Sequence, residues 1–217
     1  MGDCNVLATL LSTFDVDNIP VEALLWQTGY LTIADFWQIP GRLDLTLKYP
    51  NREVQSSLND CLLQSLTGSP SAPGQQISRL YRLLQTRDFA GLQALFHAFF
   101  ATIPHDWYRK NALSGFEGYY ASIFYSHFAA LGLDIQLEDT TNHGRIDMAV
   151  LFDGHVFLFE FKEVELVPEG KALQQIKDRG YADKYLGHGE PVHLIGVEFS
   201  KDARNVVGFE VETLANS

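Results

Sequence analysis

Three charged residues in the second half of the chain, Asp147, Glu160 and Lys162, have types and a spacing that could support chemistry. Two carboxylates brought side by side in a sheet repel each other unless something offsets their charge. A divalent cation does so economically, because Mg²⁺ takes one or two carboxylates and completes its shell with water and phosphate oxygens. An ammonium group beside such an ion would orient an attacking water and stabilise developing negative charge.

A β-hairpin must bring these residues together. The stretch 144–162 reads GRIDMAVLFDGHVFLFEFK, and the Asp153-Gly154 pair at its centre is typical of a two-residue type I′ turn. Alternation along the second strand puts Glu160 and Lys162 on one face and Phe157, Phe159 and Phe161 on the other. The expected opposed pairs are Phe152 with His155, Leu151 with Val156, Ala149 with Leu158, and Asp147 with Glu160.

A purely structural role is the alternative for the same charges. Asp147 would then pair with Arg145, and Glu160 with Lys162, as solvated ion pairs worth ~0–1 kcal/mol each. The run FLFEFK favours a site instead, because its charges stand only at the end of an apolar strand. Arg145 lies opposite Lys162 in this register, where it would contact a phosphate or simply balance Asp147.

Longer stretches around the hairpin resemble a known family. Asp147 followed by Glu160-Phe161-Lys162 is similar to the D…(D/E)xK signature of the PD-(D/E)XK nuclease superfamily. The run from FEGYYASIFY to FEFK, followed by KALQQIKDRGYADKYLG, resembles the domain of that superfamily found at the C-terminus of bacterial AAA-ATPase-like proteins. The resemblance covers roughly residues 103–211. It implies an α/β fold with a three-layer α/β/α core that hydrolyses nucleic acid, DNA above all, using Mg²⁺ or Mn²⁺.

The resemblance also implies roles for two further groups. The backbone carbonyl of Phe161 would complete the metal site formed by the two acids, as it does in the superfamily. Glu117 matches a glutamate on the superfamily's first helix that faces the metal, where it would hold a second ion or its water shell. Its position three residues after Ser114 fits a capping box equally well.

The helix expected from Pro168 to about Tyr185 carries Lys171, Gln175 and Arg179 on one face. A solvated polar stripe is the commoner meaning of such spacing. The resemblance favours a function, because related nucleases place a glutamine on this helix near the metal. Gln175 is therefore a candidate catalytic residue, and Lys171 and Arg179 are candidates for substrate binding.

The N-terminal part of the chain predicts a separate module that is mostly helical and winged-helix-like. The expected elements are helices over 5–14 and 20–27, β-rich stretches at 30–33 and 43–49, and a helix capped by Asn51 that runs to about Leu66. This module, residues 1–66, resembles the end of an AAA-ATPase-like domain, and a packing role suits it better than DNA reading. The run TGSPSAPGQQ, residues 67–76, reads as a linker. Residues 77–217 then hold a helical pair and the nuclease-like domain.

Composition constrains the partners. The net charge of −11 over 217 residues disfavours tight autonomous DNA binding, although a bound metal ion changes the local charge. The sequence contains no GxxxxGK[ST] phosphate loop, so an ATPase domain or protein would have to be supplied elsewhere, and the chain reads as a truncated or reduced version. It shows no secretory signal, no bilayer-spanning run, and no metal or redox spacing of its two cysteines. These features predict a cytoplasmic bacterial protein without membrane partners.

Two hypotheses follow. The first is a Mg²⁺- or Mn²⁺-dependent nuclease. The second is a non-catalytic nuclease-fold module that docks a protein partner, in line with the acidic composition. The presence of Asp147, Glu160 and Lys162 together favours the enzyme, because a scaffold has no physical need for paired carboxylates.

Overall fold

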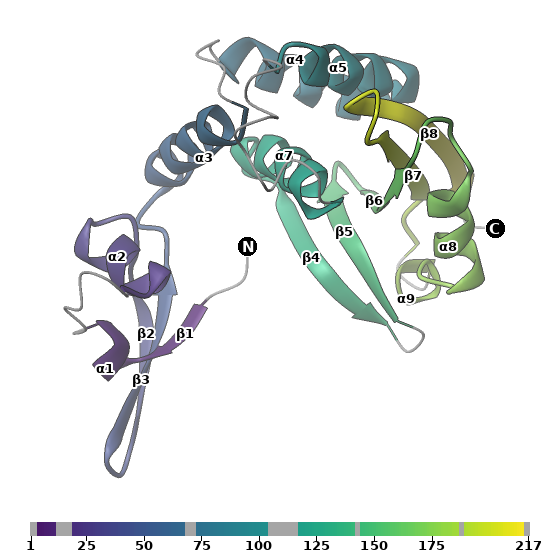
Figure 1. The fold of residues 1–217 in the computed structure, drawn as a ribbon. Coiled ribbons are helices and arrows are strands. Elements are labelled where there is room, and N and C mark those ends of the chain that lie inside the picture. The colour runs from purple at the N-terminus through teal and green to yellow at the C-terminus, as the bar shows by residue number, and fades with distance from the viewer. Residues whose placement is uncertain are drawn as a thin grey trace. The chain divides into compact units, whose positions relative to one another are not determined.

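The computed structural model describes most of the chain (Figure 1). The described residues are 4–11, 19–67, 73–103, 117–141, 144–186 and 189–214. The chain divides into two compact units, Met1–Asn59 and Asp60–Ser217, and each is treated by itself below. Among the described residues, none of the helices has the length and apolar character needed to cross a bilayer.

The first unit contains a three-stranded antiparallel sheet in the order β1-β3-β2. Its elements are β1 (Cys4–Leu7), α1 (Ala8–Leu11), α2 (Val21–Gln27), β2 (Thr32–Ile39) and β3 (Arg42–Lys48). Leu45 and Leu47 of β3 are buried in a small apolar cluster with Leu11 of α1. The helix expected over residues 5–14 is wrong at its start, because a strand of four residues is too short for periodicity to reveal. Residues 12–18 lie outside the described part, and the winged-helix assignment stays a prediction.

Helix α3 (Arg52–Thr67) begins as the sequence indicates. The side chain of Asn51 accepts a hydrogen bond from the backbone N–H of Val54 at 2.9 Å, which is the predicted N-cap. Helix α4 (Pro73–Thr86) starts inside the stretch predicted as a linker, with proline in its first turn, where the missing N–H costs nothing. Residues 68–72 lie outside the described part of the chain.

The second unit is built on a five-stranded mixed sheet in the order β4-β5-β6-β7-β8. The strands are β4 (Asp134–Thr141), β5 (Gly144–Phe152), β6 (His155–Val164), β7 (Val192–Ser200) and β8 (Asn205–Leu214). Strands β6 and β7 are parallel, and the other neighbours are antiparallel. The helices are α4, α5 (Phe89–Ala101), α7 (Glu117–Ala130), α8 (Lys171–Asp178) and α9 (Asp183–Leu186). The predicted mixed α/β architecture is confirmed.

The central hairpin forms with the predicted turn. Asp153 and Gly154 both have positive φ, at 53° and 71°, as a type I′ turn requires. The pairs Phe152–His155, Leu151–Val156 and Ala149–Leu158 are all present. The β5–β6 ladder ends at Met148–Phe159, however, so the expected strand pair between Asp147 and Glu160 is not formed.

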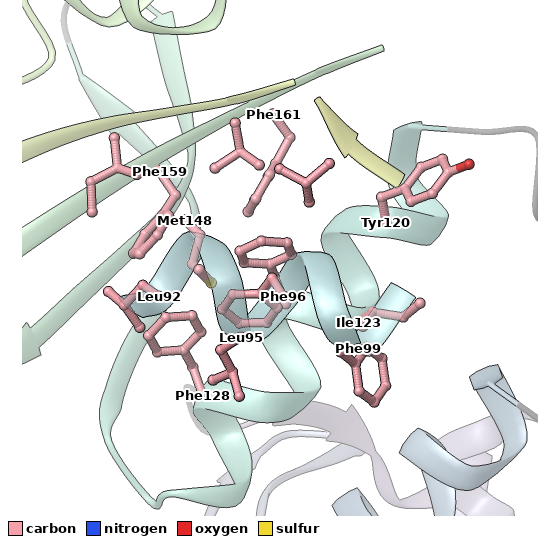
Figure 2. Packing of buried hydrophobic residues seen from close by; sticks show 14 of the residues in the cluster. Leu92, Leu95, Phe96, Phe99, Tyr120, Ile123, Phe128, Met148, Phe159 and Phe161 are labelled. Carbon is pink, nitrogen blue, oxygen red and sulfur yellow. The ribbon is translucent and has the colours of Figure 1, made fainter. Parts of the chain in front are cut away.

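Helices cover both faces of this sheet. One face packs against α4, α5 and α7 in an aromatic core, where Phe157, Phe159 and Phe161 of β6 are all buried. Figure 2 shows Phe159 and Phe161 within this core. Phe96 of α5 stacks on Phe124 of α7 with ring centroids 3.7 Å apart. The opposite face packs against α8 and α9, which lie beside β7 in Figure 1. The alternation predicted for β6 is therefore confirmed, and it turns Glu160 toward α8.

The helix expected over residues 168–185 is interrupted. Helix α8 ends at Asp178, and the chain turns through Gly180, with φ 57°, before the short α9 begins. A glycine tolerates this left-handed conformation at little steric cost, which makes it a common helix stop. Arg179 is consequently the C-cap of α8 rather than a residue of its interior.

One buried histidine in the aromatic core predicts acid sensitivity. His127 of α7 is 2% exposed, and its Nδ1–H donates to the carbonyl of Ile123 at 2.9 Å. Burial lowers the pKa of His127 from 6.5 to about 4, and the bond to Ile123 opposes that shift. The unfolded state therefore takes up a proton first as pH falls, so stability declines between about pH 6.5 and pH 4, by up to ~3 kcal/mol.

Urea unfolding at pH 7 and pH 5 measures this effect. We expect His127→Phe to lose less stability than the unmodified protein over this interval, because it removes the titrating group. All other titrating groups are the same in each variant, so the difference between variants reports the substituted histidine alone. His97→Gln, at an exposed position of α5, is the matched control. An unchanged pH dependence in His127→Phe would contradict the assignment.

Candidate active site

Glu160 lies on β6, on the face of the sheet that α8 covers. Its side chain is 1% exposed, and its backbone pairs with Gly196 of the parallel strand β7. The flanking phenylalanines face the aromatic core, so strand alternation alone aims Glu160 and Lys162 at the other face. The Lys162 Nζ lies 3.4 Å from Glu160 Oε1, with a quarter of the lysine side chain exposed. The solvated ion pair considered from sequence is thus replaced by a pair whose acid is buried.

Asp147 also lies beside Glu160, but a side-chain hydrogen bond rather than a strand pair holds it there. Beyond the last β5–β6 pair, its Oδ2 accepts a hydrogen bond from the backbone N–H of Phe161 at 2.9 Å. This bond replaces the missing ladder contact and fixes the aspartate beside the Glu160–Phe161 peptide. The two acids therefore come together although they are not directly opposed in a ladder.

The electrostatics of the two acids reflect this proximity. The pKa of Glu160 is raised to about 7, first by burial and then by the negative charge of Asp147, while Lys162 and the backbone N–H of Asp147 partly offset both. Burial also raises the pKa of Asp147, against the lowering effect of the Phe161 N–H. Glu160 Oε2 is buried and finds no hydrogen-bond partner among the described residues. A buried carboxylate oxygen without a partner is costly and calls for an explanation such as an ion.

A divalent cation fits this donor set. Hard carboxylate oxygens suit Mg²⁺ or Mn²⁺, and a cation between two acids removes their mutual repulsion. Within the described residues, no cluster of three or more His, Cys, Asp or Glu side chains could hold a metal. The remaining ligands would be the Phe161 carbonyl, water and phosphate oxygens, as is usual for Mg²⁺. Glu117 is the first residue of α7, but its side chain lies outside what the structure describes.

A cavity of about 440 Å³ opens beside Asp147. It lies between the first turns of α7 and the strands β4 and β5, and Phe161 also contributes to its wall. The full lining is Gly118, Ala121, Ser122, Tyr125, Leu137, Glu138, Asp147, Met148 and Phe161. The backbone position predicted for a metal-facing glutamate, Glu117, immediately precedes this lining. The cavity therefore reaches Asp147 from the α7 side, and Glu160 is not part of its lining.

Gln175 is brought onto the site by α8. Its Nε2 donates a short hydrogen bond to Glu160 Oε1. Together with Lys162, it occupies one oxygen of the carboxylate and leaves the other, Oε2, for a cation. Gln175 thus contacts Glu160, one of the two acids predicted to bind a metal, and its catalytic role stays a proposal.

Removing this amide should weaken metal binding. We expect Gln175→Ala to lower Mn²⁺ affinity by about 10-fold, because groups that orient a ligating carboxylate typically contribute 10–100-fold. Isothermal titration calorimetry measures the effect. The neighbouring Gln174→Ala is the matched control, since Gln174 donates to Asp178 on the exposed side of α8. Equal affinities for both variants and the unmodified protein would contradict this role.

The three candidate substrate-binding cations lie at the surface. Arg145 pairs with Glu138 of β4 at 3.0 Å, and both side chains are largely exposed. The alternative pairing of Arg145 with Asp147 is replaced by this contact, which lies across the β4–β5 hairpin. Lys171 forms an ion pair with Glu169, and Arg179 is exposed at the end of α8. Exposed pairs of this kind contribute little to stability and leave the cations accessible to a phosphate.

Two residues of β7 next to the site were not predicted from the sequence. Glu198 is 2% exposed and contacts the start of α8, and Gly196 is the backbone neighbour of Glu160. The one available signal was an acid inside the largely apolar run VHLIGVEFS.

Comparison with known proteins supports the nuclease-like character of this region. Residues 115–209 match the model of the PD-(D/E)XK nuclease superfamily, a range that contains all of α7, the hairpin and α8. The "Uncharacterized protein in vnfD 5'region" of Azotobacter chroococcum mcd 1 is 61% identical over 211 residues. Those residues are 96% of this chain, but the chain spans only about two fifths (41%) of that relative's length. No solved structure gives a significant match.

Proposed function

We propose that this chain is a Mg²⁺- or Mn²⁺-dependent nuclease that hydrolyses phosphodiester bonds in nucleic acid, DNA above all, in the bacterial cytoplasm. One observation carries the proposal. A buried glutamate, Glu160, keeps one carboxylate oxygen without a partner among the described residues, while a second acid, Asp147, stands beside it. A stable fold without a ligand has no use for this arrangement, whereas a cation would neutralise both acids.

The acids would bind and hold the ion. Asp147, oriented by the Phe161 N–H, and Glu160, oriented by Gln175, would supply two oxygens, and the Phe161 carbonyl a third. A bound Mg²⁺ lowers the pKa of a water and neutralises charge on the phosphate. Glu160 must lose its proton to bind the ion, so proton and cation compete for it near the pKa of about 7.

Lys162 would act on the reacting atoms. Its ammonium group stands 3.4 Å from Glu160 Oε1 and is partly exposed, so it can reach both the site and an entering substrate. It would hold the attacking water in line and stabilise the negative charge that develops on the phosphate oxygens. Glu117, at the start of α7, would add an oxygen for a second ion or its water shell.

Substrate binding would be electrostatic and weak in this chain alone. Arg145, Lys171 and Arg179 would contact phosphates, but the net charge of −11 opposes the approach of a polyanion. Further affinity would come from an ATPase domain or protein. A matched relative that is more than twice as long is compatible with such a partner. The winged-helix-like first unit would link the two.

A non-catalytic docking module is the second candidate. The acidic charge favours it, and so do two large apolar side chains of β2 in the first unit, Phe36 and Trp37, which are 63% and 71% exposed. Exposed aromatics of this size are typical of surfaces that bind another protein. Under this hypothesis the protein would not cleave nucleic acid, although the acid pair is present.

A cleavage assay separates the two candidates. The full chain is incubated with plasmid and with labelled single- and double-stranded oligonucleotides, with Mg²⁺, with Mn²⁺ or with excess chelator. Cleavage that requires the cation and stops in chelator supports the nuclease. Intact DNA and RNA under every cation condition would reject it in favour of the docking module.

A further inference from the structure

A buried acid outside the predicted site holds the start of α8. The carboxylate of Glu198 accepts hydrogen bonds from four consecutive backbone N–H groups. Oε2 accepts from Glu169 at 2.5 Å and Gly170 at 3.1 Å, and Oε1 from Lys171 at 2.6 Å and Ala172 at 3.3 Å. The first N–H groups of a helix lack intrahelical partners, and a negative charge there is favourable. Glu198 therefore caps α8 from a neighbouring strand, because Gly170 at the N-cap has no side chain to do so.

Two glycines make room for this contact. A Cβ on Gly196 of β7 would lie 2.8 Å from Leu173 Cα, so α8 approaches the strand at a distance that no side chain allows. Gly196 is also the backbone neighbour of Glu160. On β8, a Cβ on Gly208 would lie 3.1 Å from the Cβ atoms of both Glu198 and Pro168. The chain is thus built to seat the first turn of α8 directly on β7.

Helix α8, whose first turn Glu198 caps, also carries Gln175. Gln175 lies four residues after Lys171, about one turn or ~6 Å along the axis, and its Nε2 reaches Glu160 Oε1. Hydrogen bonds tolerate displacements of only a few tenths of an ångström before they weaken. Any shift of the first turn would therefore be passed to the amide that holds the candidate metal ligand.

We propose that Glu198 is a positioning residue: by capping α8 it sets Gln175 against Glu160 and so keeps Glu160 Oε2 open for the cation. This inference rests on the proposed metal-dependent function. A cap that only stabilised the fold would act on the whole protein and would not depend on Gln175. The two roles therefore differ in how Glu198 and Gln175 variants combine.

The experiment is a double-mutant cycle in the full chain. Glu198→Gln replaces one acceptor oxygen with an amide group that faces backbone N–H groups. Amide hydrogen exchange of residues 169–172 should become at least about 10-fold faster, which tests the cap without any metal. Mn²⁺ affinity by calorimetry should fall by about 10-fold, the range for groups that orient a ligand. In a Gln175→Ala background, the same substitution should change affinity by less than about 2-fold, because the group through which it acts is gone.

Glu212→Gln removes an exposed contact between β8 and Lys177 of α8, and it should leave exchange at 169–172 and Mn²⁺ affinity unchanged. If Glu198→Gln does not fold, Glu198→Asp shortens the reach while keeping the charge, and the same cycle applies. An unchanged Mn²⁺ affinity in Glu198→Gln, or an equal loss with and without Gln175, would overturn the positioning role alone. Failure of the unmodified protein to bind Mn²⁺ would overturn the proposed function as well.

Discussion

Replacing Lys162 with alanine is expected to reduce cation-dependent cleavage by about 10²–10³-fold or more while leaving the fold intact. Loss of a preorganised group that stabilises transition-state charge has effects of this size. Lys162 stands 3.4 Å from Glu160 Oε1 and is 27% exposed, so its removal opens no cavity in the core. Steady-state cleavage of a labelled oligonucleotide measures the loss, and circular dichroism with thermal unfolding checks the fold.

The matched control for this variant is Lys48→Ala. Lys48 is an exposed lysine at the end of β3 in the first unit, so its removal changes the net charge of the protein equally. Cleavage by Lys48→Ala should stay within about 2-fold of the unmodified protein, because this variant changes only the net charge, whose effect on an approaching polyanion is weakened by salt. Comparable activity in the two lysine variants would remove Lys162 from the mechanism.

Glu160→Gln should move metal affinity and stability in opposite directions. The folded-state pKa of about 7 lies above the ordinary 4.5, so the cost of ionising the buried carboxyl grows from pH 4.5 to pH 7 and persists above it. The neutral amide avoids this cost, so the metal-free variant should be more stable at pH 8, by up to about 3 kcal/mol. Loss of one of two acidic ligands should lower Mn²⁺ affinity by about 100-fold or more.

Calorimetry measures the Mn²⁺ affinity of Glu160→Gln, and urea unfolding in chelator measures its free energy of unfolding without metal. Glu212→Gln, which removes an exposed acid of β8, should change neither by a comparable amount. A variant that is destabilised in chelator and binds Mn²⁺ normally would show that Glu160 is a structural residue. A gain in stability together with a loss of affinity is the signature expected of a functional site.

Local chemistry made the hairpin predictable from sequence. Asp153-Gly154 sets the turn type, the turn type sets the register, and alternation then sends the phenylalanines of β6 to one face. Each step depends on residues that are close in the chain, which is why the three predicted pairs nearest the turn were confirmed, whereas the predicted pair of Asp147 with Glu160 was wrong. The same reasoning identified Asn51 as the cap of α3.

Long-range contacts set the features that sequence reasoning missed or misplaced. The side chain of Asp147 replaces a ladder bond by taking the Phe161 N–H, so the acids meet outside the strand register. Arg145 finds Glu138 on a neighbouring strand rather than Asp147. Glu198 caps a helix that begins 27 residues earlier in the chain, and no local pattern marks such a contact. Strand β1 was also missed, because its four residues are too few to show the two-residue period of a strand.

The most direct test of the account is the position of a bound cation. Crystals of the full chain grown with Mn²⁺ and measured at an anomalous wavelength would reveal it. We predict a peak within about 2.1 Å of oxygens from both Asp147 and Glu160, with Glu160 Oε2 among its ligands. A peak elsewhere, or none at the Mn²⁺ concentrations that support cleavage, would contradict it.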